Sequence, residues 1–239
     1  MALLICAPTG KELNALLPNL TPEVGEEMCL LPVRLKKGGA FACATGVGPI
    51  NAALALGKCL AEAEAGKTPI HAVLLAGLAG AFDLDRLPLR ALCLVREEIW
   101  PEYGLHDGTS VTAKAFSFPL WQRYTKDGGD VYDRLPLDTP AALSLSTAGL
   151  AGMLTECVSL TVAGVSSAFV RARDLVQRHH ADLENMEGFA VAYACARGGI
   201  PCVELRSVSN KVGPRAKDEK DFHGALQSLA RVLPGLNLI

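Results

Sequence analysis

Two carboxylate side chains and one amide side chain stand where they could act on a single polar ligand. Glu12 lies at the start of a predicted helix that follows the first apolar strand. Glu187 precedes a second apolar helix, and Asn210 ends the apolar strand after that helix. In an open α/β fold, helix starts and strand ends of this kind gather at the sheet edge where ligands bind. We therefore expect the three side chains to share one site at that edge.

Each of these residues also has a purely structural interpretation. Glu12 completes the T-x-x-E pattern of a capping box with Thr9, so it could serve the first helix alone. Glu187 could be an acid that stabilises the positive end of a helix dipole. Asn210 could cap a strand-to-loop turn through its own backbone. The residue types by themselves leave both interpretations open.

Three glycine-rich segments follow predicted strands, and glycine lets a ligand approach the backbone closely. They read GVG at 46–48, GLAG at 77–80 and GVSS at 164–167. The first begins like the dinucleotide-binding pattern G-x-G-x-x-G. However, Asn51 replaces the third glycine, and no strand ends in an acid about 20 residues later. These departures disfavour an NAD-binding protein.

Apolar strands alternate with helices along the chain, which predicts an α/β protein. We expect one domain over residues 1–239, with three α/β/α layers and a mostly parallel mixed central sheet. Residues 97–140 are predicted to form an irregular excursion from that domain. The expected strands span 2–7, 28–33, 40–45, 70–76, 89–95, 157–163 and 201–209, and the expected helices 10–17, 50–65, 141–153, 166–177, 188–197 and 218–233.

Composition excludes several classes of protein. Half of the 239 residues are hydrophobic, 20% are charged and the net charge is −2, so no electrostatic footprint for nucleic acid or an anionic membrane is visible. The first apolar run ends near Pro8 without a basic lead, and no apolar run reaches the roughly 18 residues that span a bilayer. The eight cysteines form no CxxC pair or zinc-like spacing. We expect free thiols, no metal, no cofactor and a cytoplasmic location.

Several segments of the chain resemble motifs of the nucleoside phosphorylase and nucleosidase superfamily, and they follow one another in the same order as those motifs. They are TGVGPINAA at 45–53, AGLAG at 76–80, NMEG at 185–188 and RSVSN at 206–210, together with Glu12. The resemblance runs from Ala7 to the final helix. It implies a nucleoside phosphorylase-like fold, a purine nucleoside as the small-molecule partner, and the homodimers common among such nucleosidases.

The resemblance also implies roles for individual residues. Glu12 would activate water, Glu187 would bind the 2′- and 3′-hydroxyls of the ribose, and Met186 would pack under the sugar. Phe169 would stack on the purine, and the backbone of Val170 would contact the base edge. A core position for Met186 or Phe169 is the alternative. The implied substrate contacts are Gly46, Val47, Gly77, Leu78, Ala79, Gly80, Phe169, Val170, Met186, Glu187 and Arg215, with Glu12 and Asn210 as catalytic residues.

The ending SNKVGPR at 209–215 resembles the futalosine hydrolase branch, whose reaction in menaquinone biosynthesis releases hypoxanthine and dehypoxanthine futalosine. Alternatives are a methylthioadenosine/adenosylhomocysteine or aminofutalosine nucleosidase, a purine nucleoside phosphorylase, and a non-catalytic nucleoside-binding module. Neither 46–51 nor 77–82 contains a basic residue for phosphate, which favours water as the nucleophile. The loop at 76–78 lacks a hydroxyl to hold that water.

Asn210 departs from the aspartate that related nucleosidases carry, and this departure predicts base preference. An asparagine amide can donate to a 6-oxo group while its carbonyl accepts from N7–H, a pattern that suits hypoxanthine and suits adenine badly. Lys211 and Arg215 could bind a carboxylate on the substrate tail, or they could be solvated basic residues. His106 could line the site or a subunit contact, or lie on the surface.

Overall fold

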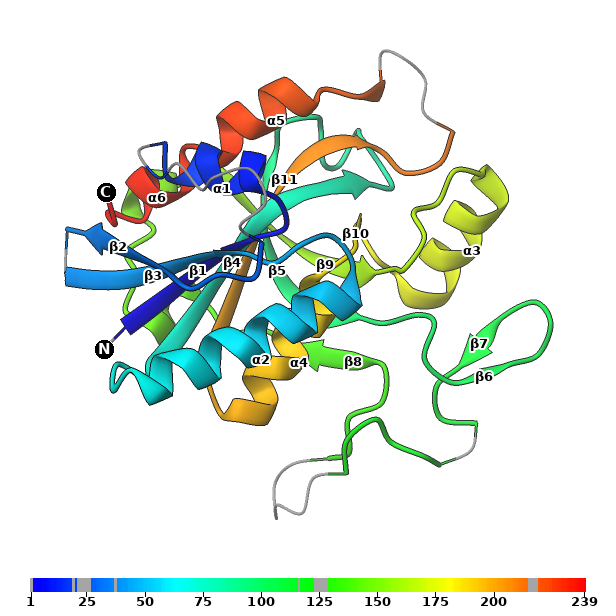
Figure 1. The fold of residues 1–239 in the computed structure, drawn as a ribbon. Helices are drawn as coiled ribbons and strands as arrows, with labels where there is room; N and C mark the ends of the chain where they lie inside the picture. Colours follow the sequence, from blue (N-terminus) through cyan, green and yellow to red (C-terminus); the bar gives the residue numbers. More distant parts are fainter. Residues whose placement is uncertain are drawn as a thin grey trace.

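One mixed sheet runs through the molecule, with helices on both faces (Figure 1). The computed structural model describes residues 2–18, 20, 27–36, 38–115, 117–122, 129–214 and 219–239. Within these residues the sheet has nine strands: β1 (Ala2–Ala7), β2 (Leu31–Leu35), β3 (Gly38–Ala44), β4 (Ile70–Ala81), β5 (Leu92–Ile99), β8 (Arg134–Pro136), β9 (Leu154–Thr161), β10 (Leu183–Asn185) and β11 (Cys202–Lys211).

The two faces of the sheet carry separate cores, which confirms the predicted α/β/α layers. One core packs under α2 (Pro49–Ala65) and α4 (Gly188–Gly198). The other packs under α1 (Gly10–Leu16), α5 (Phe222–Leu229) and α6 (Val232–Gly235). Strands buried on both faces must be apolar throughout, which is why runs such as β1 show no alternation of polar and apolar residues.

Strand β4 extends further than predicted. The expected strand ended at residue 76, but β4 continues through the glycine-rich segment 77–80. It pairs in parallel with β1 over residues 70–75 and with β11 over residues 73–81, and its end also pairs antiparallel with β10. The sheet therefore curls so that the ends of β4, β10 and β11 come together with the starts of α1, α2 and α4.

Two other predicted elements differ from the structure. The helix expected at 141–153 is wrong: only short 3-10 turns form at Pro140–Leu143 and Ala148–Leu150. Gly152 has φ +71°, and a Cβ at Gly149 would lie 2.7 Å from the carbonyl oxygen of Gly235, so these glycines serve turns and close packing. The closing helix divides into α5 and α6, and its predicted start at Asp218 falls outside the described residues.

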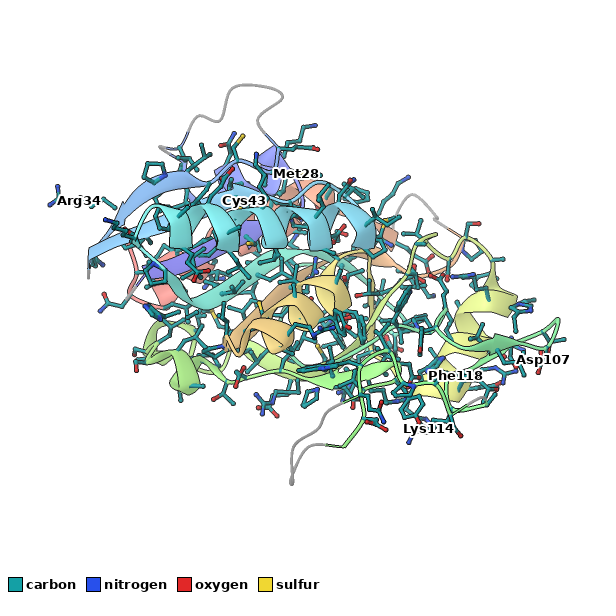
Figure 2. All side chains as sticks on the ribbon, turned by 60° about the horizontal axis from the view of Figure 1, so that its bottom comes forward. Met28, Arg34, Cys43, Asp107, Lys114 and Phe118 are labelled. Atoms are coloured by element: carbon teal, nitrogen blue, oxygen red, sulfur yellow. The ribbon has the colours of Figure 1, made fainter. Side chains whose placement is uncertain are left out.

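The excursion predicted at 97–140 is irregular over its middle part, which reaches away from the sheet, but residues 97–99 belong to β5 and β8 at 134–136 returns to pair with it. It contains the short hairpin β6 (Leu105–His106) and β7 (Val111–Thr112). Figure 2 shows Asp107, Lys114 and Phe118 on this excursion, far across the molecule from Arg34. Among the described residues, no helix has the length and apolar character that crossing a membrane requires.

Candidate active site

Glu12 is held against strand β4 by contacts from two directions. Thr9 caps helix α1, because its hydroxyl oxygen accepts from the Glu12 N–H at 3.3 Å. The Glu12 carboxylate bridges the helix cap and the sheet: Oε1 accepts from the Leu78 N–H at 2.8 Å, and Oε2 accepts from the Thr9 hydroxyl at 2.5 Å. The capping interpretation is therefore correct for Thr9, while the Glu12 side chain reaches the sheet.

Burial decides the acidity of Glu12. Its side chain is buried, and this burial raises the pKa of the carboxyl above its usual value. The hydrogen bonds from Thr9 and Leu78 and the charge of Arg206 act in the opposite direction, while the charge of Glu187 adds to the rise. A carboxylate with a raised pKa is a stronger general base for water than an exposed one.

Gly77 marks the point where Glu12 and Arg206 approach the same stretch of backbone. A Cβ at Gly77 would lie 2.8 Å from Pro8 Cδ, 2.9 Å from Arg206 Nη1 and 3.0 Å from Glu12 Oε1. No side chain fits in that space without moving a neighbour. The glycine in this predicted substrate-binding segment therefore lets an acid from α1 and a cation from β11 meet beside β4.

Glu187 joins the same group from the other half of the chain. Its Oε1 accepts from the Gly48 N–H at 3.1 Å, and its Oε2 lies 3.5 Å from Arg206 Nη1. Gly46 and Gly48 have positive φ values of 78° and 95°, a conformation that glycine adopts without strain. The structure thus brings the loop with Gly46 and Val47 to the carboxylate that was predicted to bind ribose.

Arg206 lies between the two predicted carboxylates and was not among the predicted site residues. Its side chain is fully buried and donates to Glu204 Oε1 at 2.7 Å, to Asn185 Oδ1 at 3.1 Å and to the Leu78 carbonyl at 3.2 Å. Burial alone lowers the pKa of Arg206, but the surrounding glutamates outweigh it and keep the guanidinium charged. The available signal was a lone arginine in an apolar strand, with an acid two residues before it on the same strand face.

A cation reaches the glycine-rich segments from another strand. The segments at 46–51 and 77–82 contain no basic residue themselves, which favours water over phosphate as the nucleophile. The structure supplies a cation from β11 instead, with Arg206 Nη1 beside Gly77. This cation already has carboxylate partners in Glu204 and Glu187.

Asn210 lies within β11, beside the end of β4, because β11 continues two residues beyond the expected strand end at 209. A Cβ at Gly80 would lie 3.0 Å from Asn210 Nδ2, so this glycine makes room for the amide. Nδ2 donates to the Lys211 carbonyl at 2.8 Å, and Oδ1 accepts from the Ser209 hydroxyl at 3.0 Å. One amide N–H and one carbonyl lone pair remain. Gly80 is two residues beyond Leu78 on β4, roughly 7 Å along the strand.

Phe169 and Val170 begin helix α3 (Phe169–His179) and are 58% and 82% exposed, so Phe169 is not a core aromatic. The Phe169 ring lies 3.6 Å from the position of a Cβ on Gly213, three residues after Asn210. The exposed ring therefore flanks the strand end that carries the amide.

The other residues predicted to contact the substrate differ in their burial and in their partners. Ala79 is buried in β4, where its carbonyl lies 3.2 Å from the Ser209 hydroxyl and shares that one donor with Asn210 Oδ1 at 3.0 Å, and Met186 is half-buried beside Glu187. Lys211 forms an ion pair with Glu219 at 2.8 Å, so it is already partnered. Arg215 lies outside the described residues. His106 is exposed in the β6–β7 hairpin, where its Nδ1 accepts from the Gly108 N–H.

The described residues contain no cluster of three or more histidine, cysteine, aspartate or glutamate side chains able to hold a metal ion. All eight cysteines are free thiols.

Comparison with known proteins places the chain in a family. The model of the phosphorylase superfamily matches residues 3–234. A futalosine hydrolase of Thermus thermophilus is 36% identical over 214 residues, covering 87% of this chain and 86% of that protein. A futalosine hydrolase of Streptomyces coelicolor is 34% identical over 187 residues, covering 78% and 73%.

Solved structures agree on the fold. A futalosine hydrolase mutant of Helicobacter pylori matches with a TM-score of 0.76 at 20% identity, covering 99% of this chain and 98% of that one. A 5′-methylthioadenosine/S-adenosylhomocysteine nucleosidase of Campylobacter jejuni matches with a TM-score of 0.73 at 20% identity, covering 99% of both chains. On the sequence matches, the chain belongs to the futalosine hydrolase family of the phosphorylase superfamily.

Proposed function

We propose that this protein hydrolyses the N-glycosidic bond of futalosine in menaquinone biosynthesis, releasing hypoxanthine and dehypoxanthine futalosine. The observation that carries the proposal is the convergence of Glu12 and Glu187 on Arg206 beside Gly77. Two carboxylates at one site are what hydrolysis of a glycosidic bond requires, because positive charge develops on the sugar. The family membership of the chain supports the same substrate.

In this proposal the two carboxylates divide the chemistry. Glu187 accepts hydrogen bonds from the 2′- and 3′-hydroxyls and holds the ribose over the loop at Gly48. Glu12 takes a proton from water while the water oxygen bonds to C1′. The C1′–N9 bond breaks, its electron pair goes to the purine, and the purine takes up a proton from solvent as it leaves. Glu12 then returns its proton to solvent.

The base is recognised by the strand end and the start of α3. Asn210 has one N–H and one lone pair left for the 6-oxo group and N7–H of hypoxanthine. Ser209 orients the amide, because its hydroxyl donates to Oδ1. Phe169 offers an exposed ring for stacking on the purine, and the exposed Val170 presents its backbone to the base edge.

Water is favoured over phosphate as the nucleophile. A phosphate site needs a cation with charge to spare. Arg206 is the cation beside the predicted loops, and Glu204 and Glu187 already balance its charge at 2.7 Å and 3.5 Å. A phosphate anion placed beside Arg206 would be repelled by the carboxylates of Glu12, Glu187 and Glu204, which disfavours a phosphorylase.

The test is product analysis with purified protein. Futalosine, inosine, aminofutalosine and methylthioadenosine are incubated separately, with and without phosphate, and the released base is identified by chromatography. We expect hypoxanthine from futalosine at a rate independent of phosphate. Faster release of adenine from methylthioadenosine, or release that requires phosphate, would contradict the proposal. Tight futalosine binding without base release would indicate a non-catalytic binding module.

We further propose a cytoplasmic homodimer. Val47, Ile50 and Leu54 are 47%, 82% and 60% exposed and follow one another from the loop bound by Glu187 into α2. Adjacent exposed apolar side chains of this kind mark protein interfaces. Light scattering should give twice the mass of the chain, and Leu54→Asp should shift the protein to a monomer. A monomeric wild-type protein would overturn the dimer.

A further inference from the structure

Two more carboxyl groups lie behind Arg206, and the proposed reaction does not use them. Glu98 on β5 and Glu204 on β11 are both fully buried. Glu204 stands two residues before Arg206, so both side chains leave the same face of β11. The Arg206 Nε–H donates to Glu204 Oε1 at 2.7 Å, on the side of the guanidinium opposite to the Nη1 that faces Glu187.

Glu98 and Glu204 meet beside the first residue of α4. A Cβ at Gly188 would collide with Glu98 Oε1 and lie 2.7 Å from Glu204 Oε1. The glycine therefore leaves the space in which both carboxyl groups lie, and the charge of each acts directly on the other. Two carboxyl groups in contact inside a protein cannot both remain ionised, because each charge repels the other without screening by water.

Among the described residues, one oxygen atom of the pair, Glu204 Oε2, lacks a hydrogen-bond donor. Asn185 Nδ2 and the Thr161 hydroxyl each donate to one oxygen of Glu98 at 2.6 Å, and Arg206 donates to Glu204 Oε1. Glu204 Oε2 is buried and receives no hydrogen bond from an N–H or hydroxyl group of the described residues. A proton held between the two carboxyls would supply the missing donor. Burial and the charge of Glu204 both raise the pKa of Glu98 well above its ordinary value.

We propose that Glu98 and Glu204 share one proton and act as a positioning pair for Arg206, with Glu204 charged and Glu98 neutral. Charged Glu204 holds the guanidinium of Arg206 in place and balances its charge from the side that faces away from Glu187. Neutral Glu98 fixes Glu204 through the shared proton. The significance for catalysis rests on the proposed function: with Arg206 balanced from behind, Glu12 and Glu187 keep the negative charge that stabilises a cationic sugar.

The network that holds the pair also positions the ribose anchor. Asn185 Oδ1 accepts from the Glu187 N–H at 2.8 Å and from Arg206 Nη2 at 3.1 Å, while its Nδ2 donates to Glu98. The Thr161 hydroxyl oxygen accepts from the Phe189 N–H in the first turn of α4 and donates to Glu98. A change in the charge of the pair would therefore reach Glu187 through one intermediate residue.

The other ionisable groups that act on the pair are few. Arg206 acts from β11, Glu187 from the residue before α4, and the thiols of Cys157 and Cys202 from β9 and β11. The hydrogen bonds of Cys157 with Cys93 and of Cys202 with Cys195, followed by burial, raise the pKa of both thiols well above the ordinary value, so they stay neutral. Arg206 is accordingly the cation that the pair must balance.

The first test needs no substrate, so its failure is distinct from failure of the proposed function. Infrared spectra of protein labelled with ¹³C-glutamate should show the carbonyl band of a protonated carboxylic acid at neutral pH. This band should disappear in Glu98→Gln. It should persist in the control Glu97→Gln, since the neighbouring Glu97 is partly exposed and pairs with Arg134 at 2.8 Å. Absence of the band from the wild type, or its survival in Glu98→Gln, would overturn the proposal.

The second test separates positioning from simple structural support. In Glu204→Gln the carboxylate of Glu204 no longer balances the charge of Arg206. The unbalanced positive charge of Arg206 should therefore lower the pKa of Glu12. We expect kcat to fall roughly tenfold to a hundredfold and the acid limb of kcat/KM to move to lower pH. In Glu98→Gln the amide can donate to Glu204 as the proton did, so the acid limb should stay in place.

Two outcomes of the second test would overturn the inference. One is an equal shift of the acid limb in both variants, which would mean that Glu98 carries charge. The other is a lower kcat in Glu204→Gln with an unchanged pH profile, which would mean that Glu204 only supports the fold. If Glu204→Gln does not fold, the infrared band of the wild type and of Glu98→Gln decides the proposal.

Discussion

The backbone N–H of Leu78 donates a 2.8 Å hydrogen bond to Glu12 Oε1, joining residues 66 positions apart in the chain. This bond turns the carboxylate from its own helix toward β4, where Gly77 leaves room for Arg206. Glu12 thereby becomes a buried acid at a site shared with Glu187. A residue that began as a candidate helix cap is placed where it can act on a substrate.

The first prediction concerns pH. Burial holds the pKa of Glu12 above the reference value of about 4.3 for glutamate. A general base works only when it is deprotonated, so kcat/KM for futalosine should fall as pH drops through this raised pKa and stay constant above it. Glu12→Gln should lower kcat about 10²- to 10⁴-fold, measured by hypoxanthine release.

A matched control for Glu12 is Glu62→Gln. Glu62 lies on the exposed face of α2, where it pairs with Lys58 at 3.6 Å. This variant should keep the wild-type rate and pH profile. Full activity in Glu12→Gln, or a wild-type acid limb at the position of an ordinary exposed glutamate, would contradict the assigned role.

The second prediction uses two glycines as a matched pair. Gly77→Ala introduces a Cβ within 3.0 Å of Glu12 Oε1 and Arg206 Nη1, so it should displace them and lower kcat roughly a hundredfold. Gly57→Ala on α2 meets no atom within 4 Å. It should raise the free energy of unfolding by up to about 1 kcal/mol and leave kcat unchanged. Steady-state kinetics and urea denaturation give both readouts; equal activity in the two variants would count against the site.

The third prediction tests the ribose anchor. If Glu187 accepts a hydrogen bond from the 2′-hydroxyl, then Glu187→Gln and removal of that hydroxyl remove the same interaction. The wild type should lose kcat/KM on the 2′-deoxy analogue by a factor that corresponds to roughly 2 kcal/mol for a charged hydrogen bond. The variant should lose much less. Equal losses in both proteins would show that Glu187 does not contact the 2′ position.

The fourth prediction addresses base selection by Asn210. Asn210→Asp replaces the remaining amide donor with an acceptor, or with an acid that can protonate N7. The ratio of kcat/KM for aminofutalosine to kcat/KM for futalosine should rise roughly tenfold or more. An unchanged ratio would mean that the base edge is recognised elsewhere. Ser209→Ala, which frees Oδ1 from its hydroxyl partner, should lower both rates without reversing the preference.

Long, uninterrupted patterns were predictable from sequence. The apolar run of β1 spans Ala2–Ala7 as expected, and the predicted helices at 50–65 and 188–197 agree with α2 and α4 within one residue at each end. Burial on both faces demands continuous apolar residues, and alanine-rich stretches favour helix locally. One of the three glycine-rich stretches was misjudged, because packing overrode its local preference, while 46–48 and 164–167 follow strands as irregular segments, as predicted. Segment 77–80 is a strand since close neighbours require small residues there.

The sequence by itself determined the inventory of chemical groups and their order: a carboxylate before the second strand, a second before α4, an amide at the end of β11, and the family motifs around them. Only the tertiary structure decided which of these groups lie together. It placed Arg206 between Glu12 and Glu187, and it set Glu98 against Glu204. The reason is physical: the charge state and orientation of a buried group depend on neighbours distant in the chain, which no local pattern records.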